Sequence, residues 1–418
     1  TGKVWRRDMM RIVKRCGQQT AQAIFREALT LDNEKREKSF KWAMLSESAP
    51  RLNAMIGEAE PMLAIDIADF DCDPSLVNFK NGTMEKNGTL RKHRREDYLM
   101  AIANVDYDPH RTCLNWLGFL DHAMGGNEDL VAFLQRAVGY SLTGHIDERC
   151  MFVPYGSGRN GKTTFVETIA KMMGDYAGGL RSETLMLKRW DTIPSDIAAL
   201  KGKRFVTVAE AGEHARLDES LVKQITGGDT IKARFMYAEL FEFQPECKLW
   251  LSTNHKPAIR GPDPAIWDRI RLVPFSVRIA DPKPRREVDA MFKAEMAGIM
   301  AWAVQGMLQW YEGGLAEPDG VIAATAQYQS ESDAVGAFIA ECCELGIDFK
   351  ESSGDLFAAY RYWAEREGER SISHQMFGRK LAERDVLTLN REGGKRRYWT
   401  GIRLLNEAIP PDGWKGYI

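Results

Sequence analysis

Apolar residues recur at two different spacings along the chain, and the change of spacing outlines its architecture. Between residues 111 and 142 they fall at helical spacing, at Trp116, Phe119, Leu120, Phe133 and Leu134, which predicts helices. From about Cys150 to Ile279 short apolar runs alternate with helical or loop segments, a pattern typical of an α/β sheet that carries ligand loops at its strand ends. Residues 287–310 return to helical spacing and are predicted to form one helix.

The N-terminal hundred residues mix helical patterns with turns. The charged stretch 32–38 is interpreted as the solvated face of a helix. Two Asn-Gly turns, within residues 78–83 and 87–90, predict short antiparallel strands. The basic run 91–95 that follows them is able to contact a nucleic-acid backbone, and an exposed loop without that role fits it equally well.

The last eighty residues predict three helices followed by a hairpin, the pattern of a winged helix. The helices are expected at 335–344, 353–367 and 374–383, and the hairpin is expected to join 387–390 to 397–402 around Gly393-Gly394. Lys395, Arg396 and Arg397 on this wing would face phosphates or solvent. With a linker at 313–318, the predicted domains are residues 1–145, 146–315 and 330–418.

A glycine-rich stretch in the central segment fits a phosphate-binding loop. Gly, four residues, Gly, Lys and Thr follow an apolar run and precede an amphipathic helix. The loop N–H groups would surround the phosphates of ATP, the Lys162 ammonium would sit near the β and γ oxygens, and the Thr163 hydroxyl would ligate Mg²⁺. The predicted ATP-binding residues are Gly156, Ser157, Gly158, Arg159, Asn160, Gly161, Lys162, Thr163 and Thr164.

Two later strands are predicted to end in polar side chains that complete a hydrolytic site. The strand that starts at Arg204 ends in Glu210, the candidate for coordinating Mg²⁺ through water and for polarising the attacking water, with Glu213 in reserve. The strand that starts at Lys248 ends in Asn254, whose amide can hold the attacking water or sense the γ-phosphate.

Two further elements indicate how ATP hydrolysis could be coupled to nucleic-acid binding and to a neighbouring subunit. Alternating residues around 236–238 predict a β-hairpin with Lys232 and Arg234 on one arm, which suits the backbone of single-stranded nucleic acid. Arg269 and Arg271 precede another apolar strand, and either is compatible with a structural role. In oligomeric ATPases an arginine so placed reaches the γ-phosphate bound by a neighbouring subunit.

Composition and charge say more about the cellular compartment of the protein than about its function. The formal net charge is −2, so any nucleic-acid binding must come from local clusters. The seven scattered cysteines show no zinc spacing and predict a reducing, cytosolic compartment. No apolar run is long enough to span a bilayer. Because the first residue is Thr1, we expect a fragment or a processed form that lacks an N-terminal domain.

Taken in order, these motifs resemble superfamily 3 helicases, and most closely the phage and plasmid primase-helicases related to the poxvirus helicase-primase. The resemblance rests on the phosphate loop, the acidic strand end, Thr-Gly-Gly-Asp-x-Ile-x-Ala-Arg, Leu-x-Leu-Ser-Thr-Asn and Trp-Asp-Arg-Ile, all between Cys150 and Arg278. It is weaker in residues 71–82 and in the last eighty residues. Many members carry two adjacent acids at the second motif, whereas Glu210 lies between two alanines, which leaves the general base open.

The resemblance implies an α/β fold with an AAA+ type P-loop ATPase core, a mixed N-terminal domain and a C-terminal winged helix. It implies an ATP- and Mg²⁺-dependent homohexamer that moves 3′ to 5′ on single-stranded DNA in the host bacterial cytoplasm, together with a primase domain or other replication proteins. It assigns the catalytic roles to Lys162, Glu210, Asn254 and Arg269, with Arg269 acting on the adjacent subunit, and DNA tracking to Lys232, Arg234 and the loop near Tyr237.

Two other functions fit parts of the same pattern. An origin-binding or loading protein would use ATP only to assemble on DNA, and a strand-displacement assay distinguishes it from a helicase. A metabolic P-loop kinase would leave Arg269 and the hairpin without a task.

Overall fold

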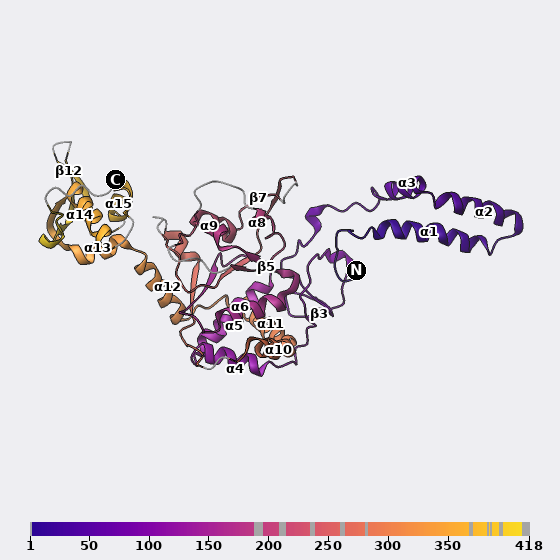
Figure 1. Ribbon diagram of the computed structural model, residues 1–418, viewed down its shortest axis with the longest axis horizontal. Coiled ribbons are helices and arrows are strands. Elements are labelled where there is room, and N and C mark those ends of the chain that lie inside the picture. Colours follow the sequence, from indigo (N-terminus) through magenta and orange to yellow (C-terminus); the bar gives the residue numbers. More distant parts are fainter. Residues whose placement is uncertain are drawn as a thin grey trace. The chain divides into compact units, whose positions relative to one another are not determined.

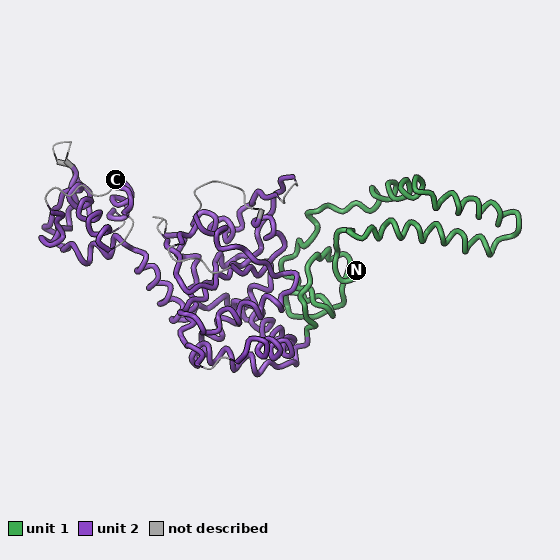
Figure 2. Tube along the Cα trace, viewed as in Figure 1, with its two compact units in different colours: residues 1–107 green, residues 108–418 purple. Residues whose placement is uncertain are grey.

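The structure is a computed structural model that describes residues 2–187, 195–208, 215–234, 239–259, 264–280, 283–367, 371–382, 384, 387–392 and 396–411. Its contacts divide the chain into two compact units, Thr1–Tyr107 and Asp108–Ile418 (Figure 2). The sequence placed a domain boundary at 145, but the helices between 114 and 142 group with the sheet that follows them. The reason is tertiary packing, because the Trp116 ring stacks on Phe165, 5.6 Å away between ring centroids.

Unit 1 begins with three helices, of which α1 packs against the other two (Figure 1). Their shared core consists mainly of small side chains, at Ala21, Ala28, Ala43 and Leu52. The charged stretch at the start of α2 is exposed and holds i,i+4 ion pairs, which confirms the predicted solvated face. The bounds are α1 Ile12–Ala28, α2 Asn33–Ser46 and α3 Ala49–Ala59.

A small antiparallel sheet completes unit 1 and confirms the predicted turns. Its strands are β1 Val77–Phe79, β2 Gly82–Met84 and β3 Leu90–Arg91, with the short helices η1 Ile67–Asp69 and η2 Arg95–Asp97 beside them. Arg91 forms ion pairs with Asp97 and Glu85, both at 2.7 Å, and its side chain is 14% exposed. The first residue of the basic run therefore stabilises the unit, while Lys92 and Arg94 are exposed.

Unit 2 is built on a five-stranded sheet in the order β10-β4-β9-β6-β5, and every pair of neighbours is parallel. This confirms the predicted α/β segment. The strands are β4 Met151–Tyr155, β5 Ala177–Leu180, β6 Phe205–Val208, β9 Lys248–Leu251 and β10 Ile270–Pro274. Between them lie α6 Lys162–Met173, η3 Gly174–Tyr176, α7 Ser182–Leu185, α8 Ser195–Ala198, α9 Glu219–Gly227 and η4 Pro264–Arg269.

The helices that precede the sheet segment along the chain pack against the helices that follow it. α4 Leu114–Ala123 and α5 Glu128–Leu142 precede it, and α10 Arg285–Ala294 and α11 Met296–Gly313 follow it. A Cβ on Gly139 would lie 2.0 Å from the Met307 amide nitrogen, so glycine lets α5 and α11 approach closely.

The prediction of one helix over 287–310 is wrong, because the helix is interrupted at Glu295. This residue has φ −93° and ψ 6°, outside the helical region. Its carboxylate accepts hydrogen bonds from the Asn115 and Trp116 amides, both at 3.0 Å. Glu295 therefore caps the start of α4, a distant partner that helical spacing does not reveal.

The C-terminal segment contains the three predicted helices and the hairpin, with two elements that the sequence did not indicate. The unpredicted helix α12 Asp319–Glu331 precedes α13 Ala334–Cys342, α14 Ser353–Arg366 and α15 His374–Ala382. The unpredicted strand β11 Cys343–Ser352 pairs with β13 Arg396–Leu404, which also pairs with β12 Thr388–Glu392. Residues 343–352 alternate poorly, so this pairing, rather than a local pattern, fixes β11 as a strand. The last element of the described residues is η5 Asn406–Ala408.

Among the described residues, no helix has the length and apolar content required to cross a bilayer.

Candidate nucleotide-binding site

The predicted phosphate loop connects the end of β4 to the start of α6. Gly158, Arg159 and Gly161 have positive φ values of 95°, 52° and 88°, so the chain curls between strand and helix. A Cβ on Gly156 would lie 2.1 Å from the Asn160 Nδ2 atom and 2.2 Å from the Phe275 carbonyl oxygen, so this position requires glycine. The loop opens a helix of 12 residues, whose N-terminus attracts anions.

Lys162 lies at the centre of the site and is 4% exposed. Its ammonium donates to the Gly156 carbonyl at 2.7 Å, to Asn160 Oδ1 at 2.9 Å and to Asn254 Oδ1 at 2.9 Å. The structure thus brings together two of the predicted residues, Lys162 and Asn254, from segments 92 residues apart. An ammonium so placed at the start of α6 can interact with a phosphate oxygen.

Asn160 does more than the general loop motif implies. Its amide nitrogen donates to the Phe275 carbonyl at 2.8 Å, and its oxygen accepts from Lys162. Phe275 directly follows β10, so one side chain fixes both the loop and the lysine relative to the neighbouring strand. From the sequence alone, Asn160 is predicted only to belong to the loop, since this partner is 115 residues away.

A cavity of about 550 Å³ opens beside Lys162 and Thr163, and the carboxyl ends of β5, β6 and β9 line it. Ligands bind at this edge of parallel sheets. Arg181, which follows β5, also lines the cavity and pairs with Asp196 at 2.7 Å. Sequence analysis missed Arg181, because the strand Ala-Gly-Gly-Leu before it carries almost no β-pattern. A charged residue directly after a strand was the available signal.

The acidic candidates lie outside the described residues. Glu210 and Glu213 are in the segment 209–214. The strand that leads to them, β6, ends at Val208, and Thr207 and Val208 line the cavity. Their assignment as metal ligand or general base stays a prediction.

Arg269 lies at the amino ends of the parallel strands, whereas the phosphate loop lies at their carboxyl ends. It is the last residue of η4, and the next residue, Ile270, pairs with Met151 at the start of β4. The loop follows the other end of that strand, and five residues of strand span about 16 Å. Arg269 donates to the Ala265 carbonyl at 2.7 Å, and it is absent from the residues that line the cavity.

The predicted hairpin is confirmed. β7 Ile231–Ala233 pairs antiparallel with β8 Phe241–Phe243. Lys232 is exposed and pairs with Glu242 of the opposite strand at 3.4 Å, and Arg234 is exposed after β7. Tyr237 is outside the described residues, so its position in the turn is not assigned.

A buried lysine, Lys248, lies at the amino end of the parallel strands. The sequence analysis treated it only as the first residue of a strand. Lys248 is 1% exposed and donates to the carbonyls of Thr143, His145 and Glu246, the last two at 2.9 and 3.1 Å. Burial, with the neighbouring Arg204 charge, lowers its pKa to about 7. Lys248 attaches the loop before β4 to the sheet and is not among the residues that line the cavity.

Comparison with solved structures finds a weak overall similarity. The apo structure of the NrS-1 C terminal region matches 72% of this chain and 78% of its own, at a TM-score of 0.43 and 10% identity. A second form of the same region gives a TM-score of 0.43 at 9% identity. At this level the similarity supports no conclusion about fold or function.

Comparison with known sequences finds proteins of large DNA viruses. "Putative helicase L207/L206" of Acanthamoeba polyphaga mimivirus is 24% identical over 377 residues, covering 81% of this chain and 39% of the relative. "Putative helicase 022R" of Frog virus 3 is 28% identical, covering 55% and 26%. "Putative primase C962R" of African swine fever virus (isolate Tick/Malawi/Lil 20-1/1983) is 21% identical, covering 53% and 24%. The chain therefore spans well under half the length of these relatives.

Three family models match successive parts of the chain. Residues 1–125 match a family described as D5 N terminal like, residues 155–269 match a family of unknown function, and residues 330–385 match the poxvirus D5 protein-like family. The first and third models come from one kind of protein and flank the phosphate loop in the order expected from the resemblance to superfamily 3. With viral relatives named as helicases and primases across the same region, the chain is similar to the D5-like primase-helicases.

Proposed function

We propose that this chain is the motor part of a replicative DNA helicase of superfamily 3 with an AAA+ type P-loop ATPase core. The observation that carries the proposal is the contact between Lys162 and Asn254 above the carboxyl ends of five parallel strands. A strand-end amide against the loop lysine suits a site that distinguishes ATP from ADP. A cavity able to hold phosphates lies beside the contact.

In the proposed reaction the loop amides and Lys162 hold the β- and γ-phosphates of ATP. Thr163 and Glu210 would hold Mg²⁺, which supplies charge neutralisation between the phosphates. Asn254 orients the attacking water from the cavity side, and Glu210 accepts a proton from it. Thr163 lines the cavity next to the lysine, which fits the first of these metal ligands.

The position of Arg269 supports a ring. Because Arg269 and the loop lie at opposite edges of one sheet, its guanidinium would serve the site of a neighbouring subunit in a closed head-to-tail assembly. We propose a homohexamer, as in the resembling superfamily, in which each ATP lies between two subunits.

In this proposal the exposed hairpin couples ATP hydrolysis to movement along DNA. Lys232 and Arg234 would contact phosphates of single-stranded DNA, and Tyr237 is proposed to take part in the same contact. The Lys232–Glu242 pair is exposed on both sides, so a DNA phosphate can replace the carboxylate at little cost. The names of the viral relatives support a replicative role, and a primase domain elsewhere in the full-length protein fits the same names.

We further propose that residues 334–404 form a winged helix. The order helix, strand, helix, helix, strand, strand and the sheet order β11-β13-β12 support it.

ATP hydrolysis by the purified oligomer, measured with and without single-stranded DNA, tests the proposal. We expect DNA to accelerate hydrolysis, and Lys162→Ala and Glu210→Gln to abolish it, whereas Glu344→Ala in the C-terminal sheet serves as a control with unchanged rates. Strand displacement on a forked duplex should depend on ATP. A hydrolysis rate unaffected by DNA would contradict the motor, and origin binding without unwinding would favour a loader.

A further inference from the structure

Helix α12, which the sequence did not predict, lies along β10 and contacts the element that ends at Arg269. The Leu272 amide donates to Thr325 Oγ1 at 3.1 Å. The Tyr328 ring is buried edge-to-face on the Trp267 ring of η4, 5.1 Å between centroids. The position of η4, and with it Arg269, therefore depends on α12.

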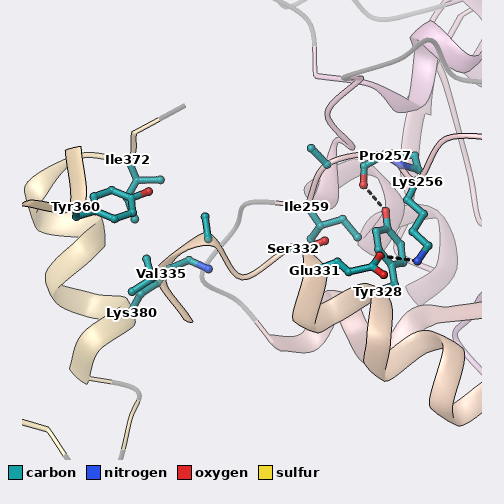
Figure 3. A pocket seen from close by; sticks show the side chains of 12 residues that line it. Lys256, Pro257, Ile259, Tyr328, Glu331, Ser332, Val335, Tyr360, Ile372 and Lys380 are labelled. Atoms are coloured by element: carbon teal, nitrogen blue, oxygen red, sulfur yellow. Dashed lines mark hydrogen bonds and ion pairs between the residues drawn. The ribbon is translucent and has the colours of Figure 1, made fainter. Parts of the chain in front are cut away.

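The last turns of α12 also hold the loop that follows β9. The Tyr328 hydroxyl donates to the Pro257 carbonyl, and the Lys256 ammonium pairs with Glu331 at 2.6 Å (Figure 3). The Lys256 side chain is 15% exposed and lies over the rings of Tyr155 and Tyr328, at 4.9 and 5.5 Å from their centroids. The Lys256 side of this pair is therefore enclosed between two rings, whereas the Glu331 side chain is 48% exposed.

The two segments that form the nucleotide site, the loop that starts at Gly156 and the strand end at Asn254, both lie within two residues of these contacts. Lys256 follows Asn254 by two residues, and Tyr155 directly precedes Gly156. Between Asn254 and Lys256 the chain is fixed by Thr253, whose hydroxyl donates to the His255 carbonyl at 2.7 Å and accepts from the His255 amide at 3.1 Å. A shift of Lys256 is therefore transmitted to Asn254 rather than absorbed by the loop.

We propose that Lys256, Tyr328 and Glu331, together the α12 latch, are positioning residues that set the Asn254 amide and η4 relative to each other. The inference rests on the proposed ATPase function and deepens it. A change at Asn254 on hydrolysis would move α12, and α12 would move the arginine that serves the next subunit. The latch thus connects the state of one site to the activity of its neighbour.

Steady-state ATP hydrolysis by full-length oligomers of single and double variants tests the latch. Lys256→Ala and Glu331→Ala are each expected to lower kcat about 10- to 100-fold, because a displacement near 1 Å has that effect on a catalytic geometry. KM should change less than about twofold, since Lys162 and the loop stay intact. The double variant should be no slower than the slower single variant, because both remove the same contact.

Conservative variants separate positioning from folding. Lys256→Arg keeps the cation and should retain most of kcat, and Tyr328→Phe should lose kcat at temperatures where circular dichroism shows that it is fully folded. The matched control is Glu344→Ala, which breaks an exposed ion pair with Arg403 and should leave kcat and KM unchanged.

The two proposals fail differently. Wild-type kcat in both alanine variants, or effects of the two that multiply in the double variant, would overturn the latch while leaving the ATPase intact. A wild-type oligomer that does not hydrolyse ATP would overturn the proposed function itself.

Discussion

Single atoms of the fold determine which residues the phosphate loop accepts. The space beside Gly156 is occupied by Asn160 Nδ2 and the Phe275 carbonyl oxygen, which themselves form a 2.8 Å hydrogen bond. This bond fixes Asn160, and Asn160 in turn accepts from Lys162. A methyl group at Gly156 would therefore disturb the lysine through two successive contacts.

We expect Gly156→Ala to weaken ATP binding about 10-fold or more, since overpacking a tight site costs roughly 1–3 kcal/mol. Titration with a fluorescent ATP analogue measures this. Gly118→Ala is the matched control, because nothing lies within 4 Å of a Cβ on this exposed glycine of α4. Unchanged affinity of Gly156→Ala would contradict the packing argument.

Lys248 offers a residue-scale test of stability. Its three carbonyl acceptors lose their donor in Lys248→Met, so we expect a loss of about 1–3 kcal/mol in the free energy of unfolding. Its pKa is about 7 in the folded chain against 10.5 as the ordinary value. Between these values the unfolded chain binds more protons, so the contribution of Lys248 to stability rises with pH.

The gap between wild type and Lys248→Met in urea unfolding should accordingly widen from pH 7 to 8.5. The window ends there because burial raises the pKa of Cys150 and Cys247 to about 12, so that the stability of both proteins falls as pH rises through 9. A gap that stays constant with pH would mean that the Lys248 pKa is not lowered.

At the scale of elements, three helices meet at Glu295. Glu295 ends α10, begins α11 and satisfies the first amides of α4, including the Asn115 side-chain amide at 2.6 Å. Because α4 carries Trp116, which stacks on Phe165 of α6, the cap also supports the helix that starts at Lys162.

Glu295→Ala is expected to destabilise the chain by about 1–3 kcal/mol, since it leaves helix N–H groups without their acceptor. Thermal unfolding followed by circular dichroism measures the change. Glu312→Ala, at an exposed position of the same helix α11, should stay within about 0.5 kcal/mol of wild type. Equal effects of the two substitutions would argue against the cap.

At the scale of the whole molecule, the arrangement of strands separates the loop from Arg269, so the role that we propose for Arg269 requires a second copy of the chain. Arg269→Ala should keep ATP affinity and lose hydrolysis by about 10³-fold, the effect typical of an arginine that acts from outside the site. Mixing it with Lys162→Ala should restore some activity, because a Lys162→Ala subunit can offer its intact Arg269 to an intact loop. No recovery in mixed rings would indicate a structural Arg269.

The predictions that succeeded share a local cause. The hairpin at 231–243 and the charged face of α2 follow from residues within a few positions of each other. Those that failed depended on distant partners. The break at Glu295 comes from α4, and β11 is a strand because β13 lies beside it. α12 carries Tyr328 and Thr325, whose partners Pro257 and Leu272 are more than fifty residues away.

The sequence by itself predicted the phosphate loop, since a backbone that curls around an anion needs glycines and a lysine at fixed local spacing, and the structure shows the curled turn between β4 and α6. It also determined the alternation of strands and helices around that loop. Only the tertiary structure decided that Asn254 contacts Lys162, that Arg269 lies at the opposite edge, and that α12 joins their two segments. The order of the strands places β9 beside β4 and so brings Asn254 to Lys162, and packing between residues far apart in the chain places α12 against both segments.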